Sequence, residues 1–169
     1  MEQRIFTEYL NDHHGYFYTV SKSLYRGRTK YQQIELVETE EFGNVLLLDN
    51  ITQVAEKADW QYHEPLVHLP MIAHPNPERV LIVGGGDGGC VREVLRHPGV
   101  ERVVQCEIDE RVTAVCREHI PSVARGLDDP RTELVFEDAV AYVRRNPETF
   151  DAVLVDSTEP IGPAEALFG

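Results

Sequence analysis

Short apolar runs alternate with amphipathic stretches from residue 76 to the end of the chain. Runs that are apolar at nearly every position and bounded by charged or turn residues are typical of strands buried on both faces of a parallel sheet. The stretches between them end at turn signals near Pro98, before Pro121 and before Pro147, so we predict a helix in each. The predicted strands are Val80–Val83, Val103–Ile108, Leu134–Phe136 and Ala152–Val155. Right-handed crossovers between such units build a doubly wound parallel sheet, with ligands at the carboxyl ends of its strands.

The first 60 residues have a different pattern, with short apolar runs separated by polar turns. We expect a small antiparallel β domain whose strands include Phe17–Val20, Ile34–Val37 and Val45–Leu48. Gly43-Asn44 lies between two of these runs and favours a hairpin turn, because both residues tolerate positive φ.

From Asp59 to His74 the apolar spacing becomes helical. Tyr62, Leu66, Leu69 and Ile72 are predicted to share one face, with Pro65 in the first turn of the helix. The segment His74-Pro-Asn-Pro-Glu78 indicates a rigid linker. The predicted domains are therefore residues 1–60, a connecting helix and linker over 61–75, and an α/β domain over 76–169.

The last predicted strand has few residues after it. In a doubly wound sheet this strand lies beside the first one and is covered by further strands, yet the sequence ends at Gly169. Proteins usually avoid an apolar edge strand that no other strand or segment covers. We therefore expect either the front part of a larger domain, lacking the C-terminal strands of the usual sheet, or a partner that covers the edge.

Candidate chemistry gathers at the carboxyl ends of the predicted strands. Gly84, Gly86 and Gly89 fit the spacing G-x-G-x-x-G, and Glu107 follows at the distance where nucleotide folds place a carboxylate on the ribose. Asp87 stands in the mouth of this loop, where dinucleotide enzymes bind a pyrophosphate. Its negative charge would repel phosphate and attract a cation. The loop thus predicts an adenosine-bearing ligand with a positively charged tail.

Composition narrows the class of protein. The chain of 169 residues carries 16 basic and 29 acidic residues, a formal charge of -13, which disfavours nucleic-acid and anionic-membrane partners. This acidity suits polycationic substrates, although it also serves simply to keep a protein soluble. The 3 cysteines form no C-x-x-C pair and the histidines show no metal-ligand spacing, so we expect buried thiols and no metal. Without a signal segment or a membrane-length apolar run, a cytoplasmic location is the expectation.

Taken together, the motifs resemble the polyamine aminopropyltransferases, the family of spermidine synthase. The resemblance spans essentially the whole chain. It is carried by Leu24-Tyr25, Tyr31-Gln32, Leu48-Asp49 with Gln53, Tyr62-His63-Glu64, Gly84-Gly-Gly-Asp-Gly-Gly89, Glu107-Ile-Asp109, Asp128-Asp-Pro-Arg131 and Asp156-Ser-Thr-Glu-Pro-Ile-Gly-Pro-Ala164. It implies a Rossmann-like sheet of the methyltransferase type, and transfer of an aminopropyl group from decarboxylated S-adenosylmethionine to an amine such as putrescine. Spermidine and methylthioadenosine would be the products, with no permanently bound cofactor and no metal.

The resemblance also implies roles for individual residues. Asp156 would be the catalytic base. The co-substrate would be bound by residues of the glycine loop and of three later strand ends, together with one N-terminal residue: Gln32, Gly84, Gly86, Asp87, Glu107, Asp138, Ala139 and Pro163. The amine acceptor would be bound by Tyr62, His63, Asp87, Asp156 and Glu159. Family members commonly pair through the N-terminal β unit, so a homodimer or higher homo-oligomer is implied.

Simpler structural roles compete with several of these assignments. Tyr62 could be a core residue of its helix, a lone histidine such as His63 is more often structural, and Asp138 could only cap the next helix. The sequence also departs from the family, because Glu159 replaces the usual aspartate and Ala139 replaces a common glycine. The longer side chain of Glu159 bears on which amine is accepted.

Other functions stay open beside aminopropyl transfer. The shortened chain could be a non-catalytic fragment that binds the nucleoside or oligomerises. Methyl transfer from S-adenosylmethionine is disfavoured by Asp87, which would face the methionine carboxylate as a like charge. An NAD-dependent dehydrogenase ranks last, because Asp87 would face the pyrophosphate.

Overall fold

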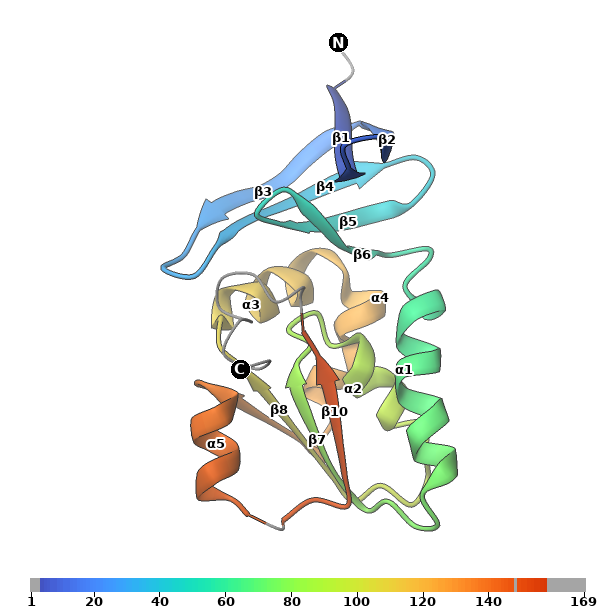
Figure 1. The fold of residues 1–169 in the computed structure, drawn as a ribbon, viewed down its shortest axis with the longest axis vertical. Coiled ribbons are helices and arrows are strands. Elements are labelled where there is room, and N and C mark those ends of the chain that lie inside the picture. Colours follow the sequence, from blue (N-terminus) through green and yellow to red (C-terminus); the bar gives the residue numbers. More distant parts are fainter. Residues whose placement is uncertain (1–3, 148, 158–169) are drawn as a thin grey trace. The chain divides into compact units, whose positions relative to one another are not determined.

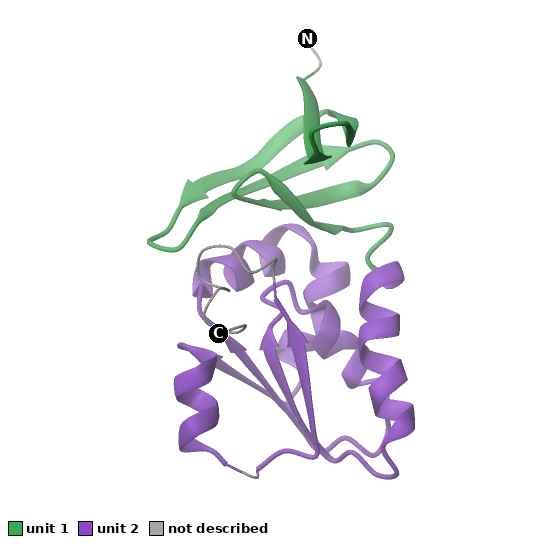
Figure 2. Cartoon of the chain, in the orientation of Figure 1, with its two compact units in different colours: residues 1–59 green, residues 60–169 purple. Residues whose placement is uncertain are grey.

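The computed structural model describes residues 4–147 and 149–157 of the chain. They form two compact units, residues 1–59 and residues 60–169 when the undescribed positions are assigned with their neighbours (Figure 2). Residues 61–75, predicted as a connecting segment, lie within the second unit. The division of the chain into domains stays a prediction.

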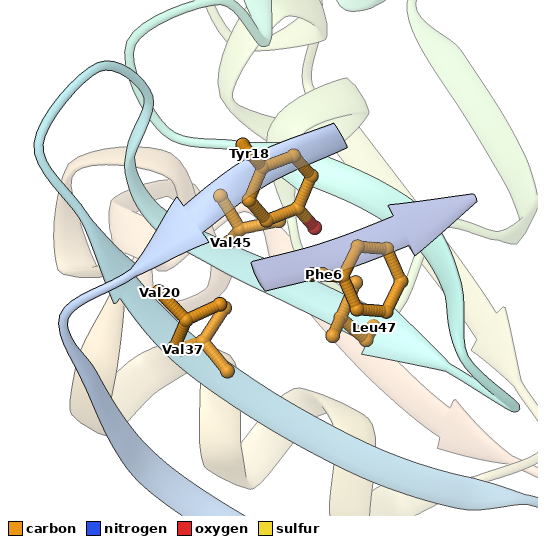
Figure 3. Close-up of a cluster of buried hydrophobic side chains, with 6 residues drawn as sticks. All are labelled: Phe6, Tyr18, Val20, Val37, Val45 and Leu47. Atoms are coloured by element: carbon orange, nitrogen blue, oxygen red, sulfur yellow. The ribbon is translucent and has the colours of Figure 1, made fainter. Parts of the chain in front are cut away.

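The first unit is entirely antiparallel, as expected. β1 pairs with β2, and a separate sheet has the order β3-β4-β5-β6. Its strands are β1 (Arg4–Asn11), β2 (His14–Val20), β3 (Lys22–Arg28), β4 (Gln33–Thr39), β5 (Gly43–Leu48) and β6 (Ile51–Ala55). A cluster of buried side chains from β1, β2, β4 and β5 forms its core, shown in Figure 3: Phe6, Tyr18, Val20, Val37, Val45 and Leu47.

The hairpin turns of this unit differ in part from the prediction. Gly43 has a φ of 70° and pairs with Thr39, so the β4–β5 turn lies over residues 40–42 and Asn44 already belongs to β5. The turn that uses two consecutive left-handed residues is Asp49-Asn50, with φ values of 48° and 63°. Asp and Asn tolerate this conformation because their short polar side chains bond locally. Gly43-Asn44 was therefore the wrong dipeptide for a two-residue turn.

The second unit contains the predicted parallel sheet. Its strand order is β10-β7-β8-β9, with every neighbouring pair parallel (Figure 1). The four apolar runs correspond to β7 (Arg79–Gly84), β8 (Arg102–Glu107), β9 (Thr132–Phe136) and β10 (Ala152–Asp156). Val80 to Val83 are all buried, which confirms that β7 is covered on both faces. Among the described strands, β10 is an edge, with Val153 and Val155 about half exposed.

Helices cover both faces of this sheet. Tyr142 of α5 packs on the face that carries Leu81, Val83, Val104 and Cys106, and α2 contacts β7 and β8. Reversal of the strand order between β9 and β10 places α5 on the face opposite α2. The helices are α1 (Trp60–Ala73), α2 (Gly89–Val94), α3 (Glu110–His119), α4 (Pro121–Ala124), the short 3-10 helix η1 (Arg125–Asp128) and α5 (Ala139–Arg145).

Helix α1 lies where the sequence predicted a helix, but it buries a different face. His63, Val67 and Met71 are its buried residues, whereas Leu69 and Ile72 are exposed. Pro65 is the sixth residue of α1 and not in its first turn. The backbone carbonyl that Pro65 cannot bond belongs to Gln61, and both residues are exposed, so water can satisfy it. The prediction failed because the buried face carries a histidine and a methionine. A search for periodic apolar residues gives these two residue types less weight than leucine.

None of the helices in the described ranges has the length and apolar character that crossing a bilayer requires. The expected cytoplasmic location stays a prediction.

Candidate functional site

Acidic residues lie at or just after the carboxyl ends of three parallel strands, along one edge of the sheet in the second unit. β7 leads into the glycine loop with Asp87, β8 ends at Glu107, and β10 ends at Asp156. The loop is tied directly to β10, because the Gly85 N–H donates to the Asp156 carbonyl at 2.9 Å. Gly84 has a φ of 81°, and a Cβ there would lie 2.1 Å from that same carbonyl oxygen. Glycine is therefore required at position 84 for β7 and β10 to approach this closely.

Asp87 is a buried carboxylate held in its charged form. Its Oδ1 accepts from the Gly89 N–H at 2.7 Å and lies 3.3 Å from His63 Nε2. Burial by itself would raise the pKa of Asp87, but the interactions with His63 and the Gly89 N–H outweigh it, so the pKa lies below its usual value. Asp87 is thus a fixed negative charge in the mouth of the loop.

His63 reaches Asp87 because no side chain separates α1 from the start of α2. A Cβ on Gly89 would lie 2.2 Å from His63 Cε1, a distance that atoms do not adopt. The His63 ring, in turn, packs edge-on to Tyr62, with ring centroids 5.4 Å apart. The buried placement of His63 agrees with the structural role as well as with the binding role.

The pKa of Asp156 is shifted in the opposite direction to that of Asp87. Its Oδ1 accepts from the Tyr62 hydroxyl at 3.0 Å. Its Oδ2 is buried, and no N–H or O–H group in the described part of the chain donates to it. Burial and the nearby negative charge of Asp87 raise the pKa of Asp156 above its usual value. Tyr62 also has a raised pKa, because of burial and its contact with Asp156. One carboxylate is kept ionised and its neighbour is made a better proton acceptor, a division of labour found between acid and base groups in enzymes.

Glu107 is the third carboxylate at this edge of the sheet and, like Asp87, is buried. Its Oε1 accepts from the Asp109 N–H at 2.8 Å, and Gly86 lies against it, since a Cβ there would come 3.0 Å from Oε2. Burial is the main cause that raises the pKa of Glu107 to about 7. A carboxyl group with this pKa can accept hydrogen bonds from ligand hydroxyls when ionised.

The residues after β9 serve helix α5. Asp138 Oδ1 accepts from the Ala141 N–H at 2.8 Å, so Asp138 is the N-cap of α5 and Ala139 is the first helical residue. Glu137 is bonded through both oxygens to Arg145 at the other end of this helix, at 2.6 Å each. The capping role that competed with ligand binding at Asp138 is therefore present.

The structure brings together the predicted residues of the second unit that it describes. Tyr62, His63, Asp87 and Asp156 form one connected group, with Gly84 and Gly86 beside them and Glu107 on the next strand. Gln32 belongs to the first unit, in the turn between β3 and β4, and its part in the site stays a prediction. Glu159 and Pro163 lie outside the described residues.

Sequence reasoning missed Cys90. Its thiol sulfur, one His63 ring nitrogen and one Asp156 carboxylate oxygen all lie within 4.8 Å of one another. All three cysteines are buried and unpaired, as expected. The sequence offers no signal that separates Cys90 from the other two, because its neighbours come from helix α1 and strand β10.

Two family models cover almost the entire chain. The spermine/spermidine synthase domain matches residues 59–169, and the spermidine synthase tetramerisation domain matches residues 5–56.

Curated relatives agree with this match. The polyamine aminopropyltransferase of Thermococcus onnurineus (strain NA1) is 50% identical, with 99% of this chain and 59% of the relative covered. That of Bacillus subtilis (strain 168) is 43% identical, with 99% and 61% covered. The chain thus spans about three fifths of the length of these relatives.

Solved structures show the same fold. A spermidine synthase in complex with the transition state analogue AdoDATO superposes with a TM-score of 0.95 at 40% identity, covering 99% of this chain and 59% of that one. The spermidine synthase of Thermotoga maritima gives a TM-score of 0.88 at 40% identity, with 92% and 56% covered. Because the spermine/spermidine synthase model matches most of the chain and the fold agrees with solved spermidine synthases, the chain belongs to the spermine/spermidine synthase family.

Proposed function

We propose that this chain carries the catalytic centre for aminopropyl transfer from decarboxylated S-adenosylmethionine to a diamine, most simply putrescine, giving spermidine and methylthioadenosine. The observation that carries the proposal is the pair Asp87 and Asp156. The buried Asp87 and the partly buried Asp156 lie near the carboxyl ends of neighbouring strands, and their pKa values are displaced in opposite directions, one below and one above the usual range. Membership of the family and the AdoDATO complex of a relative support the same reaction.

Asp156 suits the role of the base. An amine with a lysine-like pKa of about 10.4 is neutral in roughly one molecule in a thousand at pH 7, so freeing its lone pair costs on the order of 4 to 5 kcal/mol. The raised pKa of Asp156 makes it a better acceptor for that proton than an ordinary aspartate. The amine nitrogen then attacks the methylene carbon beside the sulfonium, the C–S bond breaks, and sulfur keeps the electron pair. The proton leaves on Asp156.

Asp87 is suited to binding the aminopropyl donor. Decarboxylated S-adenosylmethionine carries an ammonium group and no carboxylate, so the fixed charge of Asp87 would attract it and would repel ordinary S-adenosylmethionine. Glu107 would accept the ribose hydroxyls. Gln32, Asp138, Ala139 and Pro163 are proposed on the nucleoside, and Tyr62, His63 and Glu159 on the amine, following the family resemblance.

The test is product analysis by mass spectrometry. Protein of this sequence is mixed with decarboxylated S-adenosylmethionine and, separately, putrescine, cadaverine, agmatine or spermidine. We expect spermidine and methylthioadenosine with putrescine. Asp156→Asn should lower the transfer rate by about 10²- to 10⁴-fold, the usual contribution of a general base, while methylthioadenosine binding is kept. Equal rates in the variant would overturn the assigned base.

Binding without turnover is the alternative that the same experiment decides. Folded protein that binds methylthioadenosine and yields no product with any of the four amines would support this function and contradict the first. Product with any one of them would exclude it.

We also propose that the first unit mediates homo-oligomerisation, as the name of its matching family model suggests. The β1–β2 hairpin exposes large apolar side chains that its own unit leaves uncovered: Ile5, Tyr9, Leu10 and Phe17 are each more than half exposed. Apolar groups clustered in this way are typical of surfaces buried in an assembly.

A further inference from the structure

Three side chains that can bind a metal converge from elements that are distant in the chain. His63 comes from α1, Cys90 from the first turn of α2, and Asp156 from the end of β10. One ligand atom of each residue lies within 4.8 Å of the other two. His63 and Cys90 are buried. This cluster is therefore held by packing and does not depend on mobile surface side chains.

One carboxylate oxygen of the cluster lacks a strong hydrogen-bond donor among the described residues. Within the described residues, Asp156 Oδ2 is buried and accepts no bond from an N–H or O–H group; the weakly donating Cys90 thiol interacts with this carboxylate, and Oδ1 accepts from Tyr62. A buried carboxylate oxygen without a donor is costly. A cation beside Oδ2 would supply the missing interaction. Tyr62, whose hydroxyl donates to Asp156, is half exposed. Solvent therefore reaches a side chain that contacts this carboxylate.

The surroundings of His63 and the donor types indicate which cation fits. Asp87 lies 3.3 Å from His63 Nε2, and a histidine that binds a metal through one ring nitrogen commonly bonds a carboxylate through the other. A thiol, an imidazole and a carboxylate suit zinc or cobalt, whereas magnesium and calcium prefer oxygen ligands alone. Tetrahedral zinc holds such ligands about 2.0 to 2.3 Å from the ion. Small side-chain movements would bring these three atoms to that distance.

We propose that His63, Cys90 and Asp156 form a binding site for a zinc-class divalent cation, and that this cation and the acceptor amine exclude each other. Binding replaces the Cys90 S–H bond by a sulfur–metal bond and releases the proton to solvent. The exclusion rests on the function proposed above, because both the cation and the amine would require Asp156. The metal acts here as an inhibitor of the site and takes no part in transfer.

Cobalt titration tests the site without any turnover. Co²⁺ is added to the metal-free protein, and the near-ultraviolet charge-transfer absorption of a cobalt–thiolate bond is followed. We expect the band to saturate at one equivalent and to disappear on addition of Zn²⁺. Cys90→Ser should abolish the band, whereas the matched control Cys106→Ser, at a buried thiol on β8 that donates to the Glu137 carbonyl, should keep it. A wild type without the band, or a band that survives in Cys90→Ser, would overturn the proposal.

X-ray absorption of the zinc-loaded wild type needs no variant and covers the case in which Cys90→Ser fails to fold. One sulfur at about 2.3 Å together with nitrogen or oxygen ligands is expected. A shell of nitrogen and oxygen alone would contradict the site.

A competition experiment tests whether the cation and the amine exclude each other. Calorimetry first measures the dissociation constant of putrescine in the absence of metal, which decides by itself whether the amine binds as the proposed function requires. Putrescine at ten times that constant should then weaken the apparent affinity for cobalt about 10-fold by mass action. An unchanged cobalt affinity with bound putrescine would overturn the exclusion.

Discussion

At the scale of single residues, the site depends on how closely side chains can approach the glycine loop. His63 and Asp87 meet because Gly89 leaves room for the imidazole ring. The pairing keeps Asp87 charged, and burial together with that charge raises the pKa of Asp156. The absence of a side chain at Gly89 is therefore one condition for the charge on Asp87.

Gly89→Ala tests this dependence. The new Cβ would lie 2.2 Å from His63 Cε1, so the ring must move away from Asp87. We expect a loss of stability of about 1 to 3 kcal/mol, typical of overpacking, measured by denaturant unfolding. Gly99→Ala is the matched control, because its Cβ would meet only Asn76 Oδ1 at 3.5 Å and should change stability by less than about 0.5 kcal/mol. Equal effects of the two substitutions would contradict the steric argument.

Glu107 predicts a specific pH dependence of stability. Its folded pKa of about 7 lies above the ordinary value of 4.5, so the folded state holds this proton more tightly than the unfolded chain. Its contribution is fully present below about pH 4.5 and is lost as the pH rises through about 7, on the order of 3 kcal/mol. Unfolding of the wild type and of Glu107→Gln is compared at pH 4.5 and pH 8. The wild type should lose more stability across this range, and parallel profiles would refute the raised pKa.

The sequence predicted most of the residues that the structure brings together at the candidate site, but not their interactions. Asp87, Glu107 and Asp156 could be found because each follows an apolar run, and parallel strands bring such positions to one edge. The approach of Cys90 to Asp156 could not be found, because it depends on how α1, α2 and β10 pack. Capping and binding at Asp138 are equally compatible with its sequence, and only the cap can be read from the structure.

At the scale of elements, the N-cap of α5 allows a test of whether one residue serves both helix stability and ligand binding. Asp138→Ala removes the bond to the Ala141 N–H and should cost about 1 kcal/mol, the typical value of an N-cap. Asp138→Ser keeps a capping oxygen and should recover most of that stability. If the carboxylate also binds the adenine amino group, both variants weaken methylthioadenosine binding, as calorimetry can measure. Recovered methylthioadenosine binding in the serine variant would mean that Asp138 caps α5 and does not bind the ligand.

Elements with uniform patterns were predictable and those with mixed patterns were not. The strands of the parallel sheet were predicted within about two residues, because apolar side chains on both faces leave little ambiguity. The buried face of α1 was predicted wrongly, since His63 and Met71 occupy positions where the pattern of leucine and isoleucine pointed elsewhere. A histidine is placed in a core by its polar partner, here Asp87, which periodicity cannot detect.

At the scale of the whole molecule, the net charge of -13 complements the proposed substrates, which are all cations. An acidic surface raises the local concentration of a diamine and speeds its encounter with the site, and added salt weakens this effect. The charge by itself identifies no function. It gains meaning because the described site also contains buried carboxylates.

Self-association through the β1–β2 hairpin is the prediction that concerns the assembled protein. Phe17 is 72% exposed, so replacing it should not disturb the core of its own unit. In an oligomer that buries this hairpin, Phe17→Glu would place a charge in an apolar contact and should raise the dissociation constant at least about 10-fold, equivalent to about 1.4 kcal/mol. Light scattering over a concentration series should show smaller assemblies for this variant than for the wild type. Leu69→Glu is the matched control, also 72% exposed but on α1 of the other unit, and should leave the assembly unchanged. If Phe17→Glu associates as the wild type does, or Leu69→Glu disrupts the assembly instead, the interface must lie elsewhere.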